Sequence, residues 1–255
     1  MRTVRFRDPA GNVRRGEWTG RPGEEITVRE HYGGRVAFGN ETFSPDTVDV
    51  LPPCDPSKII CIGSSYEDHV TERNTSTPNR PSFFIKPPST VAAHRETITL
   101  PEGDHRFNCE AAFGVVISDR CNNVAATDAM SVVSGYTCLN DISNHDDCAE
   151  QDWVRATAFD GAAPIGPVIS RPENVPSDAS LRLRINGELK QDSSIDRLTV
   201  PIGDLIEELT SFMTLQPGDI IATGTPAGVG RLSDGDEVEI EIEGIGTLAH
   251  SVRIP

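Results

Sequence analysis

Lysine is scarce in this chain: of the 23 basic residues, only Lys58, Lys86 and Lys190 are lysines. Acidic residues outnumber basic ones 39 to 23, and the formal net charge at pH 7 is −16. Such a surface repels the phosphates of nucleic acids, which argues against a nucleic-acid partner. Charge repulsion of this size destabilises the compact state at low salt, so the composition favours a halophilic protein. An ordinary acidic protein from a GC-rich genome, which would also prefer arginine to lysine, is the alternative.

Long apolar runs and paired cysteines are also missing. No apolar run approaches the roughly 18 residues of a membrane-spanning helix, so we expect no membrane association. The basic N-terminus is not followed by an apolar stretch, which predicts a cytoplasmic protein. The six cysteines form no C-x-x-C pair, which argues against a zinc site and predicts reduced, mostly buried thiols.

What the chain does contain is a series of short strand patterns, which predict a mainly β fold with some helix (α+β). Residues 1–53 carry β-forming segments separated by Pro-Gly and Gly-Gly breaks, and we expect them to form a small N-terminal β domain. Leu51-Pro52-Pro53 is the predicted linker to a second domain over residues 54–255.

In the second predicted domain, the apolar run 58–63 predicts a buried strand, followed by a capping box from Ser64 to Glu67 and a short helix carrying Asp68, His69 and Glu72. Apolar positions across 202–214 share one helical face. Further strands are expected at 82–86, 107–118, 135–143, 181–189, 219–223 and 238–254, with a short helix at 128–133.

A set of segments in a fixed order resembles the fumarylacetoacetate hydrolase family, and the similarity runs from about residue 55 to the C-terminus. No segment is specific alone, but the complete series is. The segments are 58–63 leading into Tyr66-x-x-His69-x-x-Glu72, Phe83-Phe-Ile-Lys-Pro87, Glu110, Gly135-Tyr-Thr-x-x-Asn-Asp141-Ile-Ser143, Trp153-x-Arg-Ala-x-x-Phe-Asp160, Asn186-Gly-Glu-Leu-x-Gln-Asp192, Phe212-Met-Thr-Leu-x-Pro-Gly-Asp219, Thr223-Gly-Thr-Pro-Ala-Gly-Val-Gly230 and Gly244-Ile-Gly-Thr-Leu248.

The resemblance implies a β-rich roll with a small N-terminal β domain, a homodimer, and a metal-dependent enzyme acting on small 2-oxo acids. The reactions implied are acylpyruvate-type C–C hydrolysis, decarboxylation or isomerisation through a metal-stabilised enolate. Hard oxygen ligands suit Mg²⁺ or Mn²⁺, and the ligands that correspond here are Glu110 and Asp141. His69 and Glu72, which lie three residues apart and therefore share a helix face, correspond to the water-activating pair.

Four further residues are predicted to bind substrate: Lys86, His145, Gln191 and Thr225. Of these, His145 stands where the family has an arginine. Two other positions depart from the family pattern, since Ala112 replaces a carboxylate ligand and Thr157 replaces a lysine. We expect positions 108, 110 and 112 to share the face of one strand, which then keeps one carboxylate where relatives have two or three. The metal is therefore expected to bind weakly.

Because of these replacements, other functional classes stay open beside the metal-dependent enzyme. One is a catalytically impaired paralogue that acts as a binding or partner subunit. Another is a metal-free enzyme that uses only the pair His69 and Glu72. The sequence does not distinguish hydrolase, decarboxylase and isomerase, nor does it identify the substrate.

Overall fold

The computed structural model describes residues 1–21, 23–32, 35–63, 65–72, 81–103 and 105–255, and strands predominate in them. The mainly β fold with few helices is therefore confirmed. The strands are β1 (Arg2–Arg7), β2 (Val13–Glu17), β3 (Ile26–Tyr32), β4 (Arg35–Phe43), β5 (Asp49–Leu51), β6 (Ile59–Gly63), β7 (Ser82–Lys86), β8 (Val91–Ala92), β9 (Thr97–Thr99), β10 (Phe107–Cys109), β11 (Ala111–Ile117), β12 (Val133–Asn140), β13 (Ser143–Asn144), β14 (Ala163–Ser170), β15 (Ser180–Ile185), β16 (Glu188–Ser194), β17 (Ile220–Ala222), β18 (Gly230–Arg231), β19 (Glu237–Ile242) and β20 (Gly246–Arg253). The α-helices are α1 (Glu67–Glu72), α2 (His145–Ala149), α3 (Trp153–Thr157) and α4 (Ile202–Phe212), and 3-10 turns lie at Pro45–Thr47, Pro88–Thr90, Ala126–Val132, Pro172–Asn174 and Ile195–Arg197. Within the described part of the chain, no helix has the length and apolar character needed to cross a membrane.

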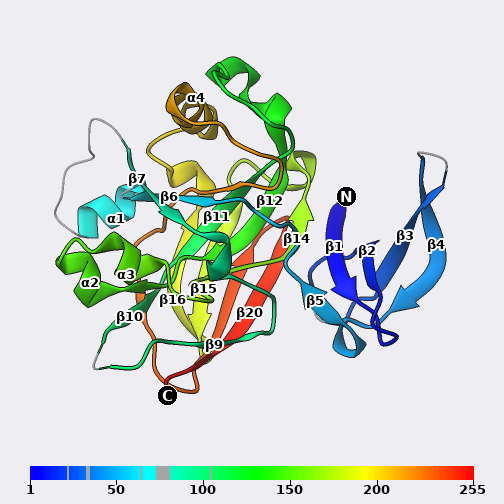
Figure 1. Cartoon of the computed structure of the whole chain (residues 1–255), viewed down its shortest axis with the longest axis horizontal. Helices are drawn as coiled ribbons and strands as arrows, with labels where there is room; N and C mark the ends of the chain where they lie inside the picture. Colours follow the sequence, from blue (N-terminus) through cyan, green and yellow to red (C-terminus); the bar gives the residue numbers. More distant parts are fainter. Residues whose placement is uncertain (22, 33–34, 64, 73–80, 104) are drawn as a thin grey trace.

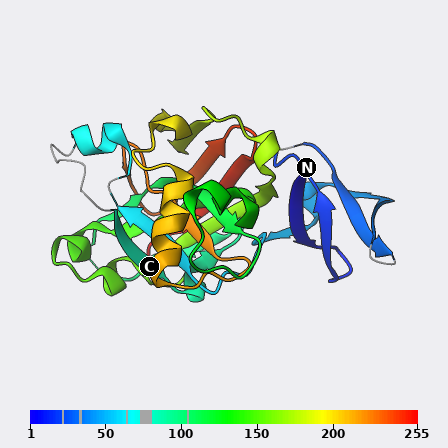
Figure 2. The ribbon, with the colours of Figure 1, turned by 90° about the horizontal axis from the view of Figure 1, so that it is seen from above.

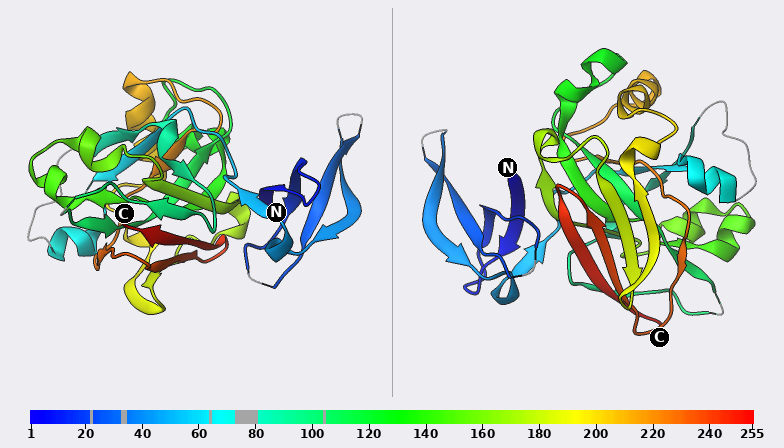
Figure 3. Two further views of the ribbon diagram at one scale, coloured as in Figure 1. Left: turned by 60° about the horizontal axis from the view of Figure 1, so that its bottom comes forward. Right: turned by 180° about the vertical axis from the view of Figure 1, so that it is seen from behind.

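The strands form three sheets. The largest runs in the order β4–β3–β2–β1–β14–β12–β11–β17–β6–β7, with β5 beside β1 and β8 beside β14. A five-stranded sheet has the order β16–β15–β19–β20–β9, and a small one has the order β13–β10–β18. Figure 3 shows the yellow and red strands of the five-stranded sheet side by side.

The N-terminal strands β1–β5 lie at one end of the molecule, and helices α1–α3 lie at the other (Figure 1). Strand β1 joins the two parts of the large sheet, because Arg2 and Thr3 pair with Ser170 and Ile169 of β14. Next to this junction, Trp18 meets the ring of His94 edge to face, with 5.9 Å between centroids. The division into domains 1–53 and 54–255 stays a prediction.

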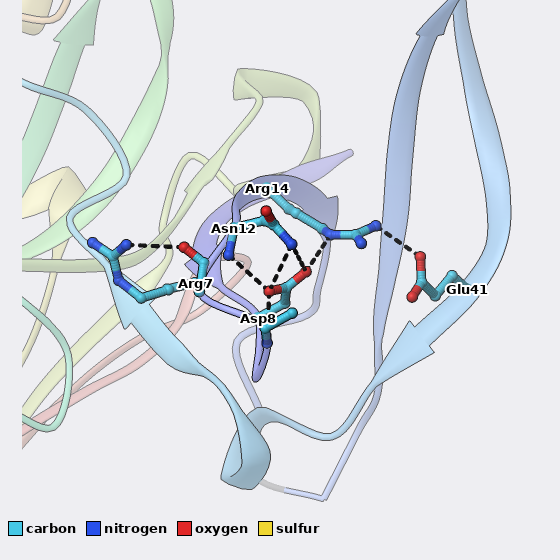
Figure 4. A network of polar contacts seen from close by, with 7 residues as sticks. Arg7, Asp8, Asn12, Arg14 and Glu41 are labelled. Carbon is cyan, nitrogen blue, oxygen red and sulfur yellow. Dashed lines mark hydrogen bonds and ion pairs between the residues drawn. The ribbon is translucent and has the colours of Figure 1, made fainter.

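The turn between β1 and β2 is organised by the buried carboxylate of Asp8 (Figure 4). It accepts hydrogen bonds from the backbone and side chain of Asn12 and from Arg14 Nε at 2.6 Å. Burial alone would raise the pKa of Asp8, but these bonds outweigh it and hold the pKa below its usual value. Arg14 also reaches Glu41 of β4 at 2.7 Å, which ties the hairpin to the outer strands.

The core lies on both faces of the large sheet, because alternate side chains of β11 pack into two different apolar clusters. Its residues Ala111, Phe113, Val115 and Ile117 face the main apolar cluster, whereas Ala112 and Val116 face a smaller cluster. Period-2 alternation with both faces apolar is typical of a strand buried between two layers. Helix α4 packs over this part of the sheet beside the turn Ala126–Val132 (Figure 2).

The predicted strand over 107–118 is wrong in one respect, because it is two strands. Strand β10 belongs to the small sheet and β11 to the large one, and Glu110 lies at the break between them. The interruption arises because side chains take the place of a neighbouring strand: Asn140 Oδ1 accepts from Glu110 N at 3.0 Å, and Gln191 Oε1 accepts from Ala111 N at 2.9 Å. Positions 108, 110 and 112 therefore do not share the face of one continuous strand.

Candidate active site

A cavity of about 820 Å³ lies beyond the ends of β6 and β17, two neighbouring strands near one edge of the large sheet. Strands β6 and β17 run parallel, with Ala222 paired to Cys61, so both chains leave the sheet at the same edge. Ligand sites of α/β-type sheets commonly lie beyond the carboxyl ends of parallel strands. The cavity is lined by Ile62, Gly63, Ser82, Phe83, Phe84, Asn108, Glu110, Asp141, Ser143, His145, Cys148, Ala149, Gln151, Trp153, Thr157, Gly224 and Thr225.

Both predicted metal ligands line this cavity. The backbone N–H of Asp141 donates to Glu110 O at 2.8 Å, so the two residues are adjacent although they are far apart in the sequence. Glu110 Oε1 accepts a hydrogen bond from Ser143 Oγ at 3.2 Å. The described residues contain no group of three or more His, Cys, Asp or Glu side chains arranged for a metal ion. Glu110 and Asp141 are the two carboxylate residues among the described lining residues.

Lys86 is fully buried behind Asp141 and is not among the residues that line the cavity. An ammonium group has three donors, and all three go to carbonyl oxygens, namely those of Ile142 at 2.8 Å, Thr157 at 3.0 Å and Ala162 at 3.0 Å. Lys86 Nζ also lies 2.8 Å from Asp141 Oδ1, so the two side chains form an ion pair. The three carbonyl bonds thus hold a positive charge beside Asp141.

Gln191 is also buried behind the cavity, and it fixes Thr225 at the surface of the cavity. Its Nε2 donates to Thr225 Oγ1 at 2.8 Å and to Pro226 O at 2.7 Å. Gly224 precedes Thr225 with φ +89°, and a Cβ at that position would lie 2.0 Å from Ser65 Oγ. Only glycine therefore allows the turn that presents Thr225.

The predicted site residues His145 and Glu72 are exposed, unlike the buried Lys86 and Gln191. His145 lines the cavity as the first residue of α2 and is exposed. Glu72 is exposed at the end of α1, and its carboxylate accepts from Gly228 N at 3.3 and 3.4 Å, so it contacts the segment that follows Thr225. The side chain of His69 lies outside the described residues. The predicted helix that carries both residues is confirmed.

A hydrogen-bonded chain that no sequence pattern indicated connects Glu110 to the C-terminal strand β20. Buried His250 lies 2.8 Å from Asn140 Nδ2, and Asn140 Oδ1 accepts from Glu110 N. Since the Asn140 amide group donates to the imidazole, His250 Nε2 is the acceptor and the ring is neutral. Burial lowers the pKa of His250 to about 4, which is consistent with this neutral state.

Thr157 and Ala112, which also depart from the family pattern, lie in different surroundings. Thr157 is almost fully buried and lines the cavity, and its hydroxyl donates to Trp153 O at 2.7 Å. Ala112 is fully buried in the smaller apolar cluster with Cys61 and Leu139. Burial, followed by the charge of Asp141, raises the pKa of the Cys61 thiol well above its usual value, so Cys61 is a neutral thiol beside the site.

An aromatic wall, which we define as Phe84 and Trp153, was also missed. The two rings stack with centroids 5.4 Å apart and planes inclined by 26°. Both residues line the cavity, and Trp153 is 48% exposed. Their sequence segments were noted only as parts of the resemblance, because nothing in the sequence shows that two residues so far apart are in contact.

Comparison with known proteins gives the class. The family model "Fumarylacetoacetate (FAA) hydrolase C-terminal" matches residues 58–253. The chain therefore belongs to the fumarylacetoacetate hydrolase family. It is 34% identical over 214 residues to the mitochondrial oxaloacetate tautomerase Fahd2a of Rattus norvegicus, which covers 80% of this chain and 68% of the relative.

Solved structures agree with this membership. A 5-carboxymethyl-2-hydroxymuconate delta-isomerase from Mycobacterium smegmatis has a TM-score of 0.88 and 35% identity, with 100% of each chain covered. A maleylpyruvate hydrolase from Sphingobium sp. SYK-6, in complex with a manganese(II) ion and pyruvate, has a TM-score of 0.81 and 28% identity, with 100% of this chain and 99% of that chain covered. The named relatives are thus a tautomerase, an isomerase and a hydrolase.

Proposed function

We propose that the protein is an enzyme that uses Mg²⁺ or Mn²⁺ to act on small 2-oxo acids, by C–C hydrolysis, decarboxylation or isomerisation. The observation that supports this most strongly is the placing of two carboxylate residues, Glu110 and Asp141, next to each other on one cavity. The fully buried Lys86 ammonium lies 2.8 Å from Asp141 Oδ1. Neighbouring carboxylates repel each other, and a cation bound by both would relieve that repulsion.

The donor set fits Mg²⁺ or Mn²⁺. Glu110 and Asp141 offer hard oxygen ligands, and Mg²⁺ is commonly bound through one or two carboxylates with water and substrate completing its coordination. A bound cation would supply Lewis-acid stabilisation of negative charge on the substrate. The manganese and pyruvate bound to the Sphingobium relative support the same assignment.

The chain's own residues would orient the substrate. Thr225 Oγ1 already accepts a hydrogen bond from Gln191, so its own proton is available for a substrate carboxylate. His145 faces the same cavity and can exchange hydrogen bonds with the substrate. The assignment of His69 as base and Glu72 as its orienting partner rests on the family resemblance, and the bond from Gly228 to Glu72 supports a position near Thr225.

Calorimetric titration of the metal-free protein with Mn²⁺ tests the proposal. We expect the wild type to bind Mn²⁺, and Asp141→Asn to lose affinity by roughly tenfold or more. Asp146→Asn is the matched control, because Asp146 is a neighbouring carboxylate that pairs with Arg106 and is not a lining residue. Turnover of oxaloacetate or an acylpyruvate should require the metal and should be lost in Asp141→Asn.

One observation favours a second candidate, a catalytically impaired paralogue that acts as a binding or partner subunit. Ala112 and Thr157 replace two charged residues of the family pattern, and Ala112 lies in an apolar cluster. A wild-type protein that binds neither Mn²⁺ nor a 2-oxo acid would reject the enzyme and favour this candidate.

A further inference from the structure

We infer that the substrate of this chain is a 2-oxo acid with an apolar, planar tail, rather than a dicarboxylate, and that Trp153 and Phe84 determine this preference. The inference rests on the proposed function, since it concerns the distal half of the same cavity. It depends on the division of the cavity into a polar end and an apolar end.

We define the polar end by the lining residues suited to a 2-oxo acid head, Glu110, Asp141, His145 and Thr225, with Lys86 and Gln191 behind them. We define the apolar end by the aromatic wall, whose two stacked rings also line the cavity.

The aromatic wall lies about 6–7 Å along the chain from Lys86 and Thr157, as strand β7 and helix α3 show independently. On β7, Phe84 and Lys86 are two residues apart and therefore point to the same face, about 6.7 Å from each other along the strand. On α3, Trp153 and Thr157 are four residues apart, about 6 Å along the helix, and are joined by the hydrogen bond from Thr157 Oγ1 to Trp153 O. A substituent on carbon 4 of a 2-oxo acid would thus extend from the carboxylates toward the aromatic wall.

The charges of the cavity argue against a second carboxylate at that position. None of the described lining residues is lysine or arginine, so nothing among them offers a permanent positive charge to a distal carboxylate. The nearby residues of α2 are acidic: Asp146 is occupied by Arg106, and Asp147 accepts from Asn144 Nδ2 at 2.6 Å. Among the described lining residues, a distal carboxylate would therefore find no permanently charged partner.

The half-exposed Trp153 supports an apolar ligand. One face of its ring stacks on Phe84, and 48% of the residue remains accessible. A planar apolar group can extend such a stack, and aromatic pairs prefer this offset arrangement. The cavity, at about 820 Å³, has room for it.

Three ligands that differ only in the substituent on carbon 4 test the inference. 4-Phenyl-2-oxobutanoate carries a phenyl group where 2-oxoglutarate carries a carboxylate. 2-Oxobutanoate carries only hydrogen there and gives the affinity of the head. With Mn²⁺ present, calorimetry should show the phenyl compound binding to the wild type about tenfold or more tightly than 2-oxoglutarate. Trp153→Ala should remove most of this preference, and Trp153→Phe should retain most of it.

Val154→Ala is the matched control, because Val154 is the next residue of α3, is 76% exposed and does not line this cavity. Its preference should equal that of the wild type. Equal or tighter binding of 2-oxoglutarate, or a preference that persists in Trp153→Ala, would overturn the inference and leave the proposed function standing. Failure of all three compounds to bind would instead reject the proposed function, and the inference with it.

Discussion

Two buried histidines should make the protein lose stability at mildly acidic pH, well above the range in which carboxylates titrate. His94 Nδ1 accepts from Ala249 N at 3.1 Å, and His250 Nε2 accepts from Asn140. Both rings are therefore held in the neutral form by their partners. Burial is the main cause that lowers the pKa of each to about 4, and for His94 the charge of Arg95 adds to it.

The sign and size of the effect follow from proton linkage. The pKa of each histidine is about 4 in the folded state and 6.5 in the unfolded state. The full stability is therefore present above pH 6.5, and it is lost as the pH falls toward 4 because the unfolded chain binds more protons. At pH 5 each histidine should reduce the free energy of unfolding by about 2 kcal/mol relative to pH 7.5, or about 4 kcal/mol together. Carboxylates with a lowered pKa, such as Asp219, lose their contribution to stability only when the pH falls below 3.8, their ordinary pKa.

Urea denaturation at pH 7.5 and pH 5.0, at one ionic strength and followed by circular dichroism, measures this loss. For a urea m-value of about 3 kcal/mol/M, the wild-type midpoint should fall by roughly 1.3 M. His250→Gln keeps a side chain that can accept from Asn140, and it should lose about half as much as the wild type between the two pH values. His105→Gln, a change at an exposed histidine, should behave as the wild type does. A wild-type midpoint that stays constant, or equal losses in all three proteins, would refute the neutral buried state of these rings.

Two further predictions concern charge. Lys86→Met leaves Asp141 buried without its counter-ion and should reduce the free energy of unfolding by about 3–5 kcal/mol, with Mn²⁺ restoring part of the loss. The control is Lys58→Met, which breaks the pair with buried Asp219 away from the cavity: thermal melts should show destabilisation that Mn²⁺ does not relieve. At net charge −16, the melting temperature should rise clearly between low salt and 1 M salt, where the screening length is about 3 Å. A melting temperature that is constant over this range would leave genome composition as the explanation for the scarce lysine.

Regular strands could be predicted from the sequence where alternation and turn residues agree. Strand β15, strands β19 and β20 within 238–254, and helix α4 lie where the pattern places them. Strand β2 was missed because its sequence, VRRGE, is mostly charged and offers little apolar alternation. Helices α2 and α3 were missed because each has only five residues. Their caps, Asn144 and Asp152, are the local signals that could have indicated them.

The site could be predicted only as far as residue types and order allow. The family pattern identified Glu110, Asp141, His145 and Thr225, which line one cavity. It did not show that Glu110 interrupts a strand, because that break depends on side chains 30 and 80 residues away. Which polar residues face a cavity and which are buried behind it is decided by packing between distant segments.

The link from His250 through Asn140 to Glu110 also determines when the site can become ordered during synthesis. Glu110 leaves the ribosome long before residue 250, by about ten seconds or more at usual elongation rates. Until strand β20 pairs with β19, the amide group of Asn140 lacks the imidazole that orients it. A nascent chain that already contains both carboxylates therefore still lacks this link to its C-terminal strand, and contacts between such distant segments generally form late.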